Sequence, residues 1–251
     1  MRRLIPDSVV SNYRKVKRWI ESRQNTHKST EQVFTEIYEK NKWGGNKGEF
    51  CSGSGSVDEQ LVSSYVSVIR EKGLAEGFLG LTFVDLGCGD FRVGQRLIPL
   101  CSRYIGVDIV EPLINENRDK YGNSNIEFLK LDIIQDQLPD GDVCFVRQVL
   151  QHLSNQQIVT ILDKIRKYPW VFITEHYPSD NQAIYPNKDK VHGGDIRLYD
   201  NSGVYLTEPP FAIPRQHLEM VLEVPGTPLG GKVDPGVIRT FLYKPAGSLT
   251  C

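Results

Sequence analysis

Val84-Asp85-Leu86-Gly87-Cys88-Gly89-Asp90 is the stretch of this 251-residue sequence that decides its fold. A β-forming run, 82–86, leads into its two glycines, and a run with helical spacing, 92–100, follows them. Glycine lets a ligand approach the backbone closely, and the first turn of a helix offers unpaired N–H groups at its positive end. The stretch therefore predicts a strand, a ligand-binding turn and a helix.

Strands and helices continue to alternate on the C-terminal side of this stretch. Since strands that alternate with helices form parallel β-α-β units, we expect a doubly wound, mostly parallel sheet of the α/β class. The β-rich runs 219–224 and 237–243 depart from this rhythm and are joined by a loop rich in Gly and Pro, which predicts an antiparallel C-terminal strand. The other expected strands are 104–109, 126–131, 143–146 and 170–174, and the other expected helices are 112–120 and 155–168.

Residues 1–78 precede the first strand and are mostly helical in pattern. Their run Ser52-Gly53-Ser54-Gly55-Ser56 is similar to a flexible linker, yet Ser56 and Glu59 have the spacing of a capping box, which begins a helix. The residues before this run carry too few apolar positions to form a core of their own. We therefore expect residues 1–78 to be an N-terminal helical lid on a domain of residues 79–251, with a plain surface loop as the alternative. The expected helices are 9–21, 31–40 and 57–73.

Composition indicates a soluble globular protein, because 39% of the residues are apolar and 24% are charged. The net charge of −1 gives no general attraction to nucleic acid or to an anionic membrane, although the stretch 13–18 is locally basic. No run of 18 apolar residues occurs, and the N-terminus lacks the apolar stretch of a signal peptide. An odd number of cysteines without metal-ligand spacing suits a reducing compartment, so we expect a cytoplasmic protein. The five cysteines are Cys51, Cys88, Cys101, Cys144 and Cys251.

Two nucleotide cofactors compete for the glycine turn. The dinucleotide fingerprint GxGxxG needs a third glycine three residues after the second, but Arg92 stands there and the next glycine is Gly94. The acids Asp85 and Asp90 would repel a pyrophosphate, whereas they suit a cofactor that carries an ammonium and a sulfonium group. The turn therefore favours S-adenosylmethionine over NAD.

On these residues the chain resembles the class I S-adenosylmethionine-dependent methyltransferases of the small-molecule type. The resemblance extends over residues 80–175 by motif and to the closing antiparallel strand by pattern. It implies a Rossmann-like fold, S-adenosyl-L-methionine as the cofactor, and a carboxylate on Asp108 that binds both ribose hydroxyls. It also implies that Asp132 and Ile133 form the adenine site and that Trp43 is an aromatic wall of the lid. The residues implicated in cofactor binding are Asp85, Gly87, Cys88, Gly89, Asp108, Ile109, Asp132, Ile133, Arg147, Gln148 and Trp43.

These residues also have purely structural interpretations. Asp85 would suit a turn and Asp132 would suit a strand end, but acids after three successive strands fall at the edge where open α/β sheets bind ligands. Just after the fourth strand the family often has an acid or an asparagine, whereas this chain has the neutral Gln148, so the resemblance does not extend to a catalytic carboxylate there. Ser54 and Ser56 are hypothetical contacts of the cofactor carboxylate.

A methyltransferase that acts on a hydroxyl group must align the oxygen with the methyl carbon, exclude water and remove a proton. His152 follows the fourth strand, at a position similar to a histidine that serves catalysis in some small-molecule methyltransferases. His176 closes the fifth strand beside Glu175. A positioned histidine base near neutral pKa contributes about 10²- to 10⁴-fold. The candidate catalytic residues are therefore His176, His152 and Glu175, and the alternative for His152 is a side chain that caps or packs at a helix start.

Residues 178–214 form a long segment rich in Asn, Asp, Tyr and His, and we interpret it as an insertion that binds the substrate. Polar groups with interleaved aromatics suit a polyhydroxylated acceptor, so the favoured acceptor is a hydroxyl oxygen of a sugar or glycan precursor. A solvated insertion is the alternative. The spacing of His176, His192 and Asp195 is not diagnostic of a metal site, and no metal ligand is predicted.

Other functions remain open at this point. The basic stretch 13–18 motivates an RNA or tRNA methyltransferase, but one solvated helix face explains it equally well and no RNA-binding module accompanies it. We therefore expect a small-molecule substrate and neither nucleic acid nor membrane as a partner. A non-catalytic protein that binds S-adenosylmethionine is the third possibility, and a dinucleotide oxidoreductase is the fourth, against which Arg92 argues.

Overall fold

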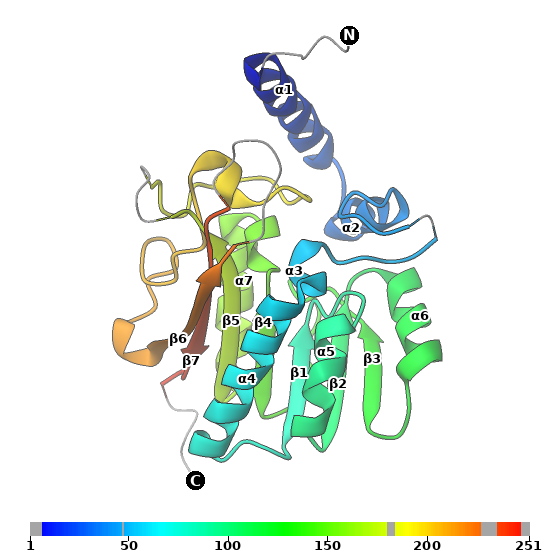
Figure 1. Ribbon diagram of the computed structural model, residues 1–251, viewed down its shortest axis with the longest axis vertical. Helices are drawn as coiled ribbons and strands as arrows, with labels where there is room; N and C mark the ends of the chain where they lie inside the picture. Colours follow the sequence, from blue (N-terminus) through cyan, green and yellow to red (C-terminus); the bar gives the residue numbers. More distant parts are fainter. Residues whose placement is uncertain (1–6, 47, 180–183, 227–234, 247–251) are drawn as a thin grey trace.

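The computed structural model describes residues 7–46, 48–179, 184–226 and 235–246. Within these ranges the strands are β1 Thr82–Leu86, β2 Arg103–Asp108, β3 Ile126–Lys130, β4 Val143–Arg147, β5 Trp170–Tyr177, β6 Leu218–Pro225 and β7 Val237–Tyr243. They form a sheet of order β3-β2-β1-β4-β5-β7-β6 (Figure 1). Strands β1 to β5 pair in parallel, whereas β7 pairs antiparallel with both β5 and β6. This confirms the predicted α/β class, a Rossmann-like, mostly parallel sheet with antiparallel C-terminal strands.

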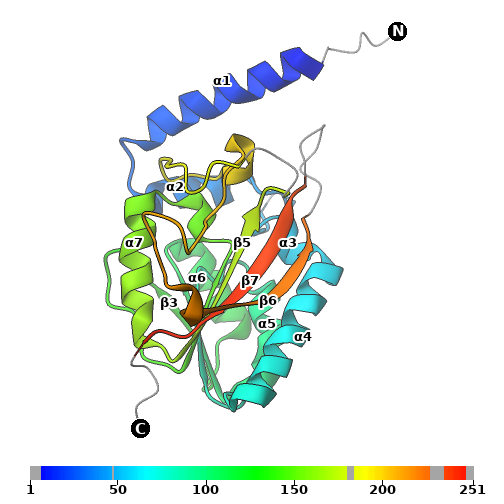
Figure 2. The same cartoon turned by 90° about the vertical axis from the view of Figure 1, so that its left-hand side faces the viewer.

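Helices cover both faces of the sheet. They are α1 Asp7–Asn25, α2 Thr30–Glu39, α3 Ser54–Val57, α4 Glu59–Glu76, α5 Arg92–Leu97, α6 Glu111–Tyr121 and α7 Asn155–Lys164, with short 3₁₀ helices η1 Ile98–Leu100, η2 Leu150–His152, η3 Ile165–Lys167, η4 Arg197–Asp200 and η5 Arg215–His217. Helices α4 and α5 lie on one face and α7 lies on the other (Figure 2). One apolar cluster packs α4, α5 and α6 on the sheet, and a second packs α7 on the opposite face. Among the described helices, none combines the length and apolar character needed to cross a lipid bilayer.

Strand β5 is three residues longer than the sequence pattern predicts, which places two candidate catalytic residues inside it. Its end is extended because β7 pairs with it as far as Tyr177, with His176 opposite Ile238 and Glu175 opposite Arg239. The antiparallel partner lies more than 60 residues further along the chain, so a pattern read along β5 alone does not reveal it. Glu175 and His176 are consequently buried residues of a central strand.

The start of α4 differs from the prediction, and the expected capping box of Ser56 and Glu59 was wrong. The N-cap is Asp58, whose Oδ1 accepts a hydrogen bond of 3.0 Å from the backbone of Leu61. The hydroxyl of Ser56 instead donates to the carbonyl of Gly53, at 2.8 Å. The reason is that Gly53, with φ of 91°, starts the separate short helix α3, which uses Ser56 before α4 begins.

Gly94 supplies the close helix packing that the third glycine of a dinucleotide fingerprint would provide. A Cβ at this position of α5 would lie 2.1 Å from the hydroxyl oxygen of Tyr104 on β2. The absence of that Cβ leaves room for the Tyr104 hydroxyl, which donates to Asp85 Oδ2 at 2.5 Å. Helix packing and the placement of the first acidic side chain are therefore linked.

Two segments meet beyond the carboxyl ends of the parallel strands. We name residues 7–78 the N-terminal segment and residues 178–214 the insertion segment. In the N-terminal segment, α2 and α3 lie above the sheet, whereas α1 extends away from the body (Figures 1 and 2). The indole N–H of Trp43 donates to the carbonyl of Gly194 at 3.1 Å, and the His192 ring donates through Nε2 to the carbonyl of Lys28 at 3.1 Å. The two segments thus cover the same edge of the sheet together.

Candidate active site

A cavity of about 350 Å³ lies at the carboxyl ends of the parallel strands, between the sheet and the two covering segments. All the residues that the sequence implicates in cofactor binding line it, and so do His152 and His176, whereas Glu175 does not. The structure therefore brings together side chains from β1, β2, β4 and β5 and from the N-terminal segment. Lining residues that the sequence reasoning did not single out as site residues include Phe34, Tyr38, Ser52, Gly55, Gln151, Gly194, Asp195, Ile196 and Tyr199.

Asp108 is fixed at the end of β2 by two backbone amides. Its Oδ2 accepts from the N–H of Gly89 and its Oδ1 accepts from the N–H of Val110, each at 3.1 Å. Burial raises the pKa of the Asp108 carboxyl to about 6, although these amides act in the opposite direction. A carboxylate has about four acceptor positions, so two remain for a ligand.

Asp85 at the end of β1 is held in a similar way. The Tyr104 hydroxyl donates to one carboxylate oxygen, and burial raises the pKa of Asp85 to about 6 while that hydrogen bond and nearby Arg147 lower it. Asp132, after β3, is half-buried and accepts from the backbone N–H of Ile134 at 2.8 Å. The three acids therefore line one cavity with defined orientations.

Arg147 at the end of β4 is a half-buried cation in the cavity wall. Its Nη2 donates to the carbonyl of Gly55 at 2.7 Å, and its guanidinium lies 5.2 Å from the centre of the Tyr65 ring. Its Nε is buried and has no hydrogen-bond partner among the described residues. Burial lowers the pKa of Arg147, which reflects a cation that has been removed from water.

Ser52 ties the N-terminal segment to the glycine turn after β1. The backbone N–H of Ser52 donates to Asp90 Oδ2 at 3.0 Å, and the backbone N–H of Asp90 donates to Ser52 Oγ at 2.8 Å. The same hydroxyl lies 3.0 Å from the hydroxyl of Tyr38. Gly89 permits this approach, since a Cβ there would lie 2.2 Å from Ser52 Oγ. The sequence signals the Gly/Ser run but not which serine makes the contact, because that depends on a pairing across 38 residues.

His152 packs among aromatic rings of the N-terminal segment. Its ring centre lies 5.0 Å from that of Trp43 and 6.3 Å from that of Phe34. Its Nδ1 lies 3.2 Å from the carbonyl oxygen of Gly193, so Nδ1 carries the proton and Nε2 is the unprotonated nitrogen. Burial lowers the pKa of His152 to about 3, and the ring is therefore neutral near pH 7.

His176 also lines the cavity, but its ring is engaged with the loop before β7. Its Nε2 donates to the carbonyl of Pro235 at 2.5 Å. Most of the residues that join β6 to β7 lie outside the described part of the chain. Within the described residues, no group of three or more His, Cys, Asp or Glu side chains is arranged to hold a metal ion.

Glu175 holds the backbone that follows β4. Its Oε1 accepts from the amides of Val149 and Leu150, at 3.2 and 2.8 Å, and its Oε2 accepts from the amide of Gln151 at 3.1 Å. Burial raises the pKa of Glu175 to about 8, against the effect of these donors. These bonds anchor the turn after Gln148, whose φ of 55° lies in the left-handed region. Glu175 does not line the cavity itself, but it therefore positions residues that do.

Replacing Glu175 with Ala is expected to lower the free energy of unfolding by about 3–5 kcal/mol, because three buried N–H groups lose their acceptor. Glu175→Gln keeps an oxygen for Val149 and Leu150 but turns an amide NH₂ toward the N–H of Gln151, so we expect a smaller loss of about 1–3 kcal/mol. Urea denaturation measures both. Glu127→Ala, at a partly exposed position of β3, serves as the control, and wild-type stability of Glu175→Ala would contradict this role.

The insertion segment contributes Asp195 and Tyr199 to the cavity. Arg18 of α1 lies over the Tyr199 ring, 4.6 Å from its centre, and its Nε is 3.9 Å from Asp195 Oδ2. Burial raises the pKa of Asp195, while Lys190 and Arg18 lower it. Lys190 donates to the backbone carbonyls of Gln151 and Asp195 and so joins the insertion segment to the end of β4.

The side chains around the cavity fit S-adenosylmethionine. The carboxylate of Asp108 has acceptor positions for ribose hydroxyls, Asp132 can accept from an exocyclic amine beside the apolar Ile133, and Asp85 and Asp90 suit the positive charges of an ammonium and a sulfonium. These groups lie at the ends of β1, β2 and β3, around the glycine turn.

Comparisons with known proteins agree with this site. A family model described as a methyltransferase domain matches residues 83–168. The fold is similar to N-methyltransferase NodS from Bradyrhizobium japonicum WM9 in complex with S-adenosyl-L-homocysteine, with 15% identity, a TM-score of 0.57, and coverage of 87% of this chain and 100% of that one. A search of curated proteins finds no match.

Two further structures share the fold and were also solved with S-adenosylhomocysteine. The 1,6-didemethyltoxoflavin-N1-methyltransferase of Burkholderia thailandensis has 16% identity and a TM-score of 0.54, over 86% of this chain and 87% of that one. Magnesium protoporphyrin IX methyltransferase from Synechocystis PCC 6803 has 15% identity and a TM-score of 0.53, over 87% of this chain and 100% of that one. At these identities the likeness establishes the shared fold. With the family match over residues 83–168 and the cavity, it leads to one conclusion: the chain carries a methyltransferase domain of Rossmann-like fold and is an enzyme with S-adenosyl-L-methionine as its cofactor.

Proposed function

We propose that this methyltransferase acts on a hydroxyl oxygen of a small molecule, a sugar or glycan precursor. The observation that carries the proposal is a pair of hydrogen-bond acceptors in the cavity wall. Gln151 is 4% exposed, and its Oε1 is buried without a partner among the described residues. His152 Nε2 is unprotonated and lies 3.5 Å from Gln151 Nε2.

The amide orientation of Gln151 follows from the neighbouring histidine. Because the Gly193 carbonyl fixes the proton of His152 on Nδ1, the amide group that faces His152 Nε2 must be the NH₂. The carbonyl Oε1 of Gln151 is therefore the atom left without a donor. A buried acceptor without a donor is unfavourable, and a hydroxylated acceptor molecule offers O–H groups that would satisfy it.

The walls around these atoms suit the same class of molecule. Trp43 and Phe34 present apolar ring surface, while Asp195 and Lys42 add charged groups that can hydrogen-bond. Faces of aromatic rings beside polar groups match the alternating apolar and polar surfaces of a sugar. The cavity volume of about 350 Å³, enclosed by two protein segments, favours a small molecule.

Methyl transfer to a hydroxyl oxygen requires specific contributions from these residues. When bound, S-adenosylmethionine would supply an electrophilic methyl group to the hydroxyl oxygen, and the electron pair of the broken carbon–sulfur bond would be left on sulfur. The wall must align the hydroxyl, exclude water and accept the hydroxyl proton. We assign the proton to His152 Nε2, whose long contact of 3.5 Å with the Gln151 amide gives way to the acceptor hydroxyl, and the Gly193 carbonyl on Nδ1 orients the ring. His176 stays a second candidate base.

We further propose that the N-terminal segment is a lid, within a division of the chain into residues 1–78 and 79–251. Support comes from Ser52, which pairs with Asp90 of the glycine turn, and from Gly55, which accepts from Arg147. These contacts join the N-terminal segment to residues that line the cavity, and we expect them to open when the cofactor enters. We also propose the cytoplasmic location that the sequence predicts. The free thiols of the described cysteines support it, because disulfides are rare in a reducing compartment. These are Cys51, Cys88, Cys101 and Cys144.

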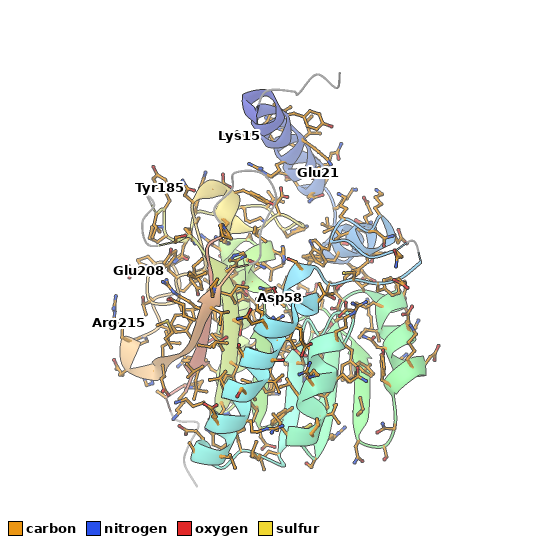
Figure 3. All side chains as sticks on the ribbon, in the orientation of Figure 1. Lys15, Glu21, Asp58, Tyr185, Glu208 and Arg215 are labelled. Atoms are coloured by element: carbon orange, nitrogen blue, oxygen red, sulfur yellow. The ribbon has the colours of Figure 1, made fainter. Side chains whose placement is uncertain are left out.

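Part of the basic stretch that motivates an RNA substrate has another use. Arg18 is engaged with the insertion segment. Lys15 and Lys17 are exposed on α1, where Lys15 lies remote from the sheet (Figure 3), and the side chain of Arg14 lies outside the described residues. The alternative of an RNA or tRNA methyltransferase therefore rests on the exposed lysines of α1.

An acceptor screen tests the proposed function. Each reaction contains purified protein, S-adenosylmethionine and one candidate acceptor. The acceptors are nucleotide sugars, free sugars, matched amino sugars and tRNA. The release of S-adenosylhomocysteine is measured. We expect turnover with a hydroxylated sugar compound, and NMR of the product should place the new methyl group on oxygen. Methylation of nitrogen alone, or of tRNA alone, would contradict the proposal, and cofactor binding without turnover on any of these compounds would support a non-catalytic protein.

A further inference from the structure

The unpartnered nitrogen of Arg147 marks a ligand contact that the carboxylates of the cavity do not explain. The guanidinium has five N–H donors, of which Nη2 is used by Gly55 O, while the buried Nε has no acceptor among the described residues. The residue lines the cavity wall. A buried donor without an acceptor is costly, and most such groups in folded proteins meet a protein group, water or a ligand.

The acids of the chain do not neutralise this cation by direct contact. Asp85 and Asp90 act on Arg147 through their charge, but one carboxylate oxygen of Asp85 is taken by the Tyr104 hydroxyl and Asp90 accepts from the backbone of Ser52. Glu175 also acts on Arg147 only through its charge, because its oxygens accept three backbone amides. In the part of the chain that is described, no ion pair joins Arg147 to a carboxylate. The wall therefore presents a cation that suits an anionic group of a ligand.

The order of the strands indicates which anionic group this is. The adenine and ribose positions belong to the ends of β3 and β2, and the sheet order β3-β2-β1-β4 puts Arg147 on the far side of the β1 glycine turn. Adjacent strands are about 4.8 Å apart, so an extended ligand that starts at β3 reaches β4 after about 14 Å. The far end of S-adenosylmethionine is its amino-acid end, which carries a carboxylate.

We infer that Arg147 binds the carboxylate at the amino-acid end of the cofactor. The inference rests on the cofactor alone and is independent of the acceptor proposed above. Ser54 and Ser56, the contacts hypothesised from the sequence, suit this task less well, because Ser56 donates to Gly53 and neither serine carries a charge. Because the same guanidinium also binds Gly55 O, the carboxylate and the N-terminal segment share one cation.

The test is calorimetric titration with two probes. S-adenosylhomocysteine has the carboxylate, and decarboxylated S-adenosylhomocysteine keeps the adenosine, the sulfur and the amine but lacks it. We expect Arg147→Gln to weaken binding of S-adenosylhomocysteine by roughly 10- to 100-fold and binding of the decarboxylated probe by less than about 3-fold. Arg147→Lys keeps the charge without the planar fork, so it should lie between wild type and Arg147→Gln. Arg103→Gln removes an exposed arginine from the start of β2 and is the matched control.

The outcomes separate a ligand contact from a structural role. Equal weakening of both probes by the Arg147 variants would show that the residue only supports the fold, and unchanged affinity for S-adenosylhomocysteine would show that it makes no contact. If Arg147→Gln does not fold, Arg147→Lys and the wild type still decide, because equal affinity of wild-type protein for the two probes would overturn the inference. None of these measurements uses a methyl acceptor, so failure of the proposed acceptor class does not affect them.

Discussion

Asp108→Ala is expected to weaken binding of S-adenosylhomocysteine by at least about 100-fold, because hydrogen bonds to a charged carboxylate contribute about 1.5–3 kcal/mol each and the ribose offers two hydroxyls. Two acceptor positions of Asp108 remain after Gly89 and Val110 have donated to it. Isothermal titration calorimetry measures the effect. Asp108→Asn keeps one acceptor oxygen without the charge and should give an intermediate loss.

Two controls make the Asp108 result specific. Asp163→Ala removes an exposed carboxylate of α7 far from the cavity and should leave affinity unchanged. NAD should not bind the wild-type protein. Because burial raises the pKa of Asp108 to about 6 in the ligand-free protein, affinity should fall as the pH is lowered through about 6, where the carboxylate gains a proton. Wild-type affinity of Asp108→Ala would rule out the ribose contact.

His152→Ala is expected to lower kcat by about 100-fold, near the lower limit for a general base, because a pKa of about 3 makes the ring a weak base. His152→Phe is the matched variant, since it keeps an aromatic ring against Trp43 and Phe34 but has no nitrogen. Both variants should bind S-adenosylhomocysteine within about 3-fold of wild type. Steady-state kinetics with the acceptor found in the screen measures kcat, and wild-type turnover by His152→Phe would show that the residue only packs.

The pH dependence provides a second readout for His152. Its pKa is lower in the folded protein than the ordinary value of 6.5, so the folded protein holds the neutral ring and the unfolded chain takes up the proton first. The contribution to stability is present above pH 6.5 and is lost as the pH falls from 6.5 toward 3. His152→Phe should therefore reduce the acid sensitivity of unfolding in that range, whereas turnover between pH 6.5 and 8 should show no titration that belongs to His152.

The fold, and the gathering of the strand-end acids around one cavity, could be predicted from the sequence because both depend on local patterns. Asp85, Asp108 and Asp132 each follow an apolar run that forms a parallel strand, and such strands bring their carboxyl ends to one edge. The predicted Ser56 capping box was wrong because the short helix α3 precedes α4 and Asp58 caps α4 instead. Element boundaries shift most where a distant partner decides them, as β7 does for the end of β5.

The chemistry around the acceptor is less accessible from the sequence, because it depends on contacts between distant residues. The pKa of His152 is set by burial under the N-terminal and insertion segments, and its tautomer is set by Gly193, 41 residues away. Glu175 stands next to a histidine in the sequence, which is a pattern typical of a catalytic acid. Its oxygens nevertheless accept hydrogen bonds from three backbone amides. The sequence does not point to Gln151, because its proposed role depends on a side-chain oxygen that has no hydrogen-bond donor among the described residues.

The contact between the N-terminal and insertion segments bears on how such an enzyme can change its substrate over evolutionary time. Trp43 and Gly194 meet through one hydrogen bond above a cavity whose floor is built by the sheet. Substitutions in these two segments can reshape the space around the acceptor while the acids at the strand ends stay in place. With the proposed acceptor site, part of substrate choice thus lies on stretches of chain other than those that carry the strand-end acids, and protein engineers can alter these stretches while they leave the acids intact.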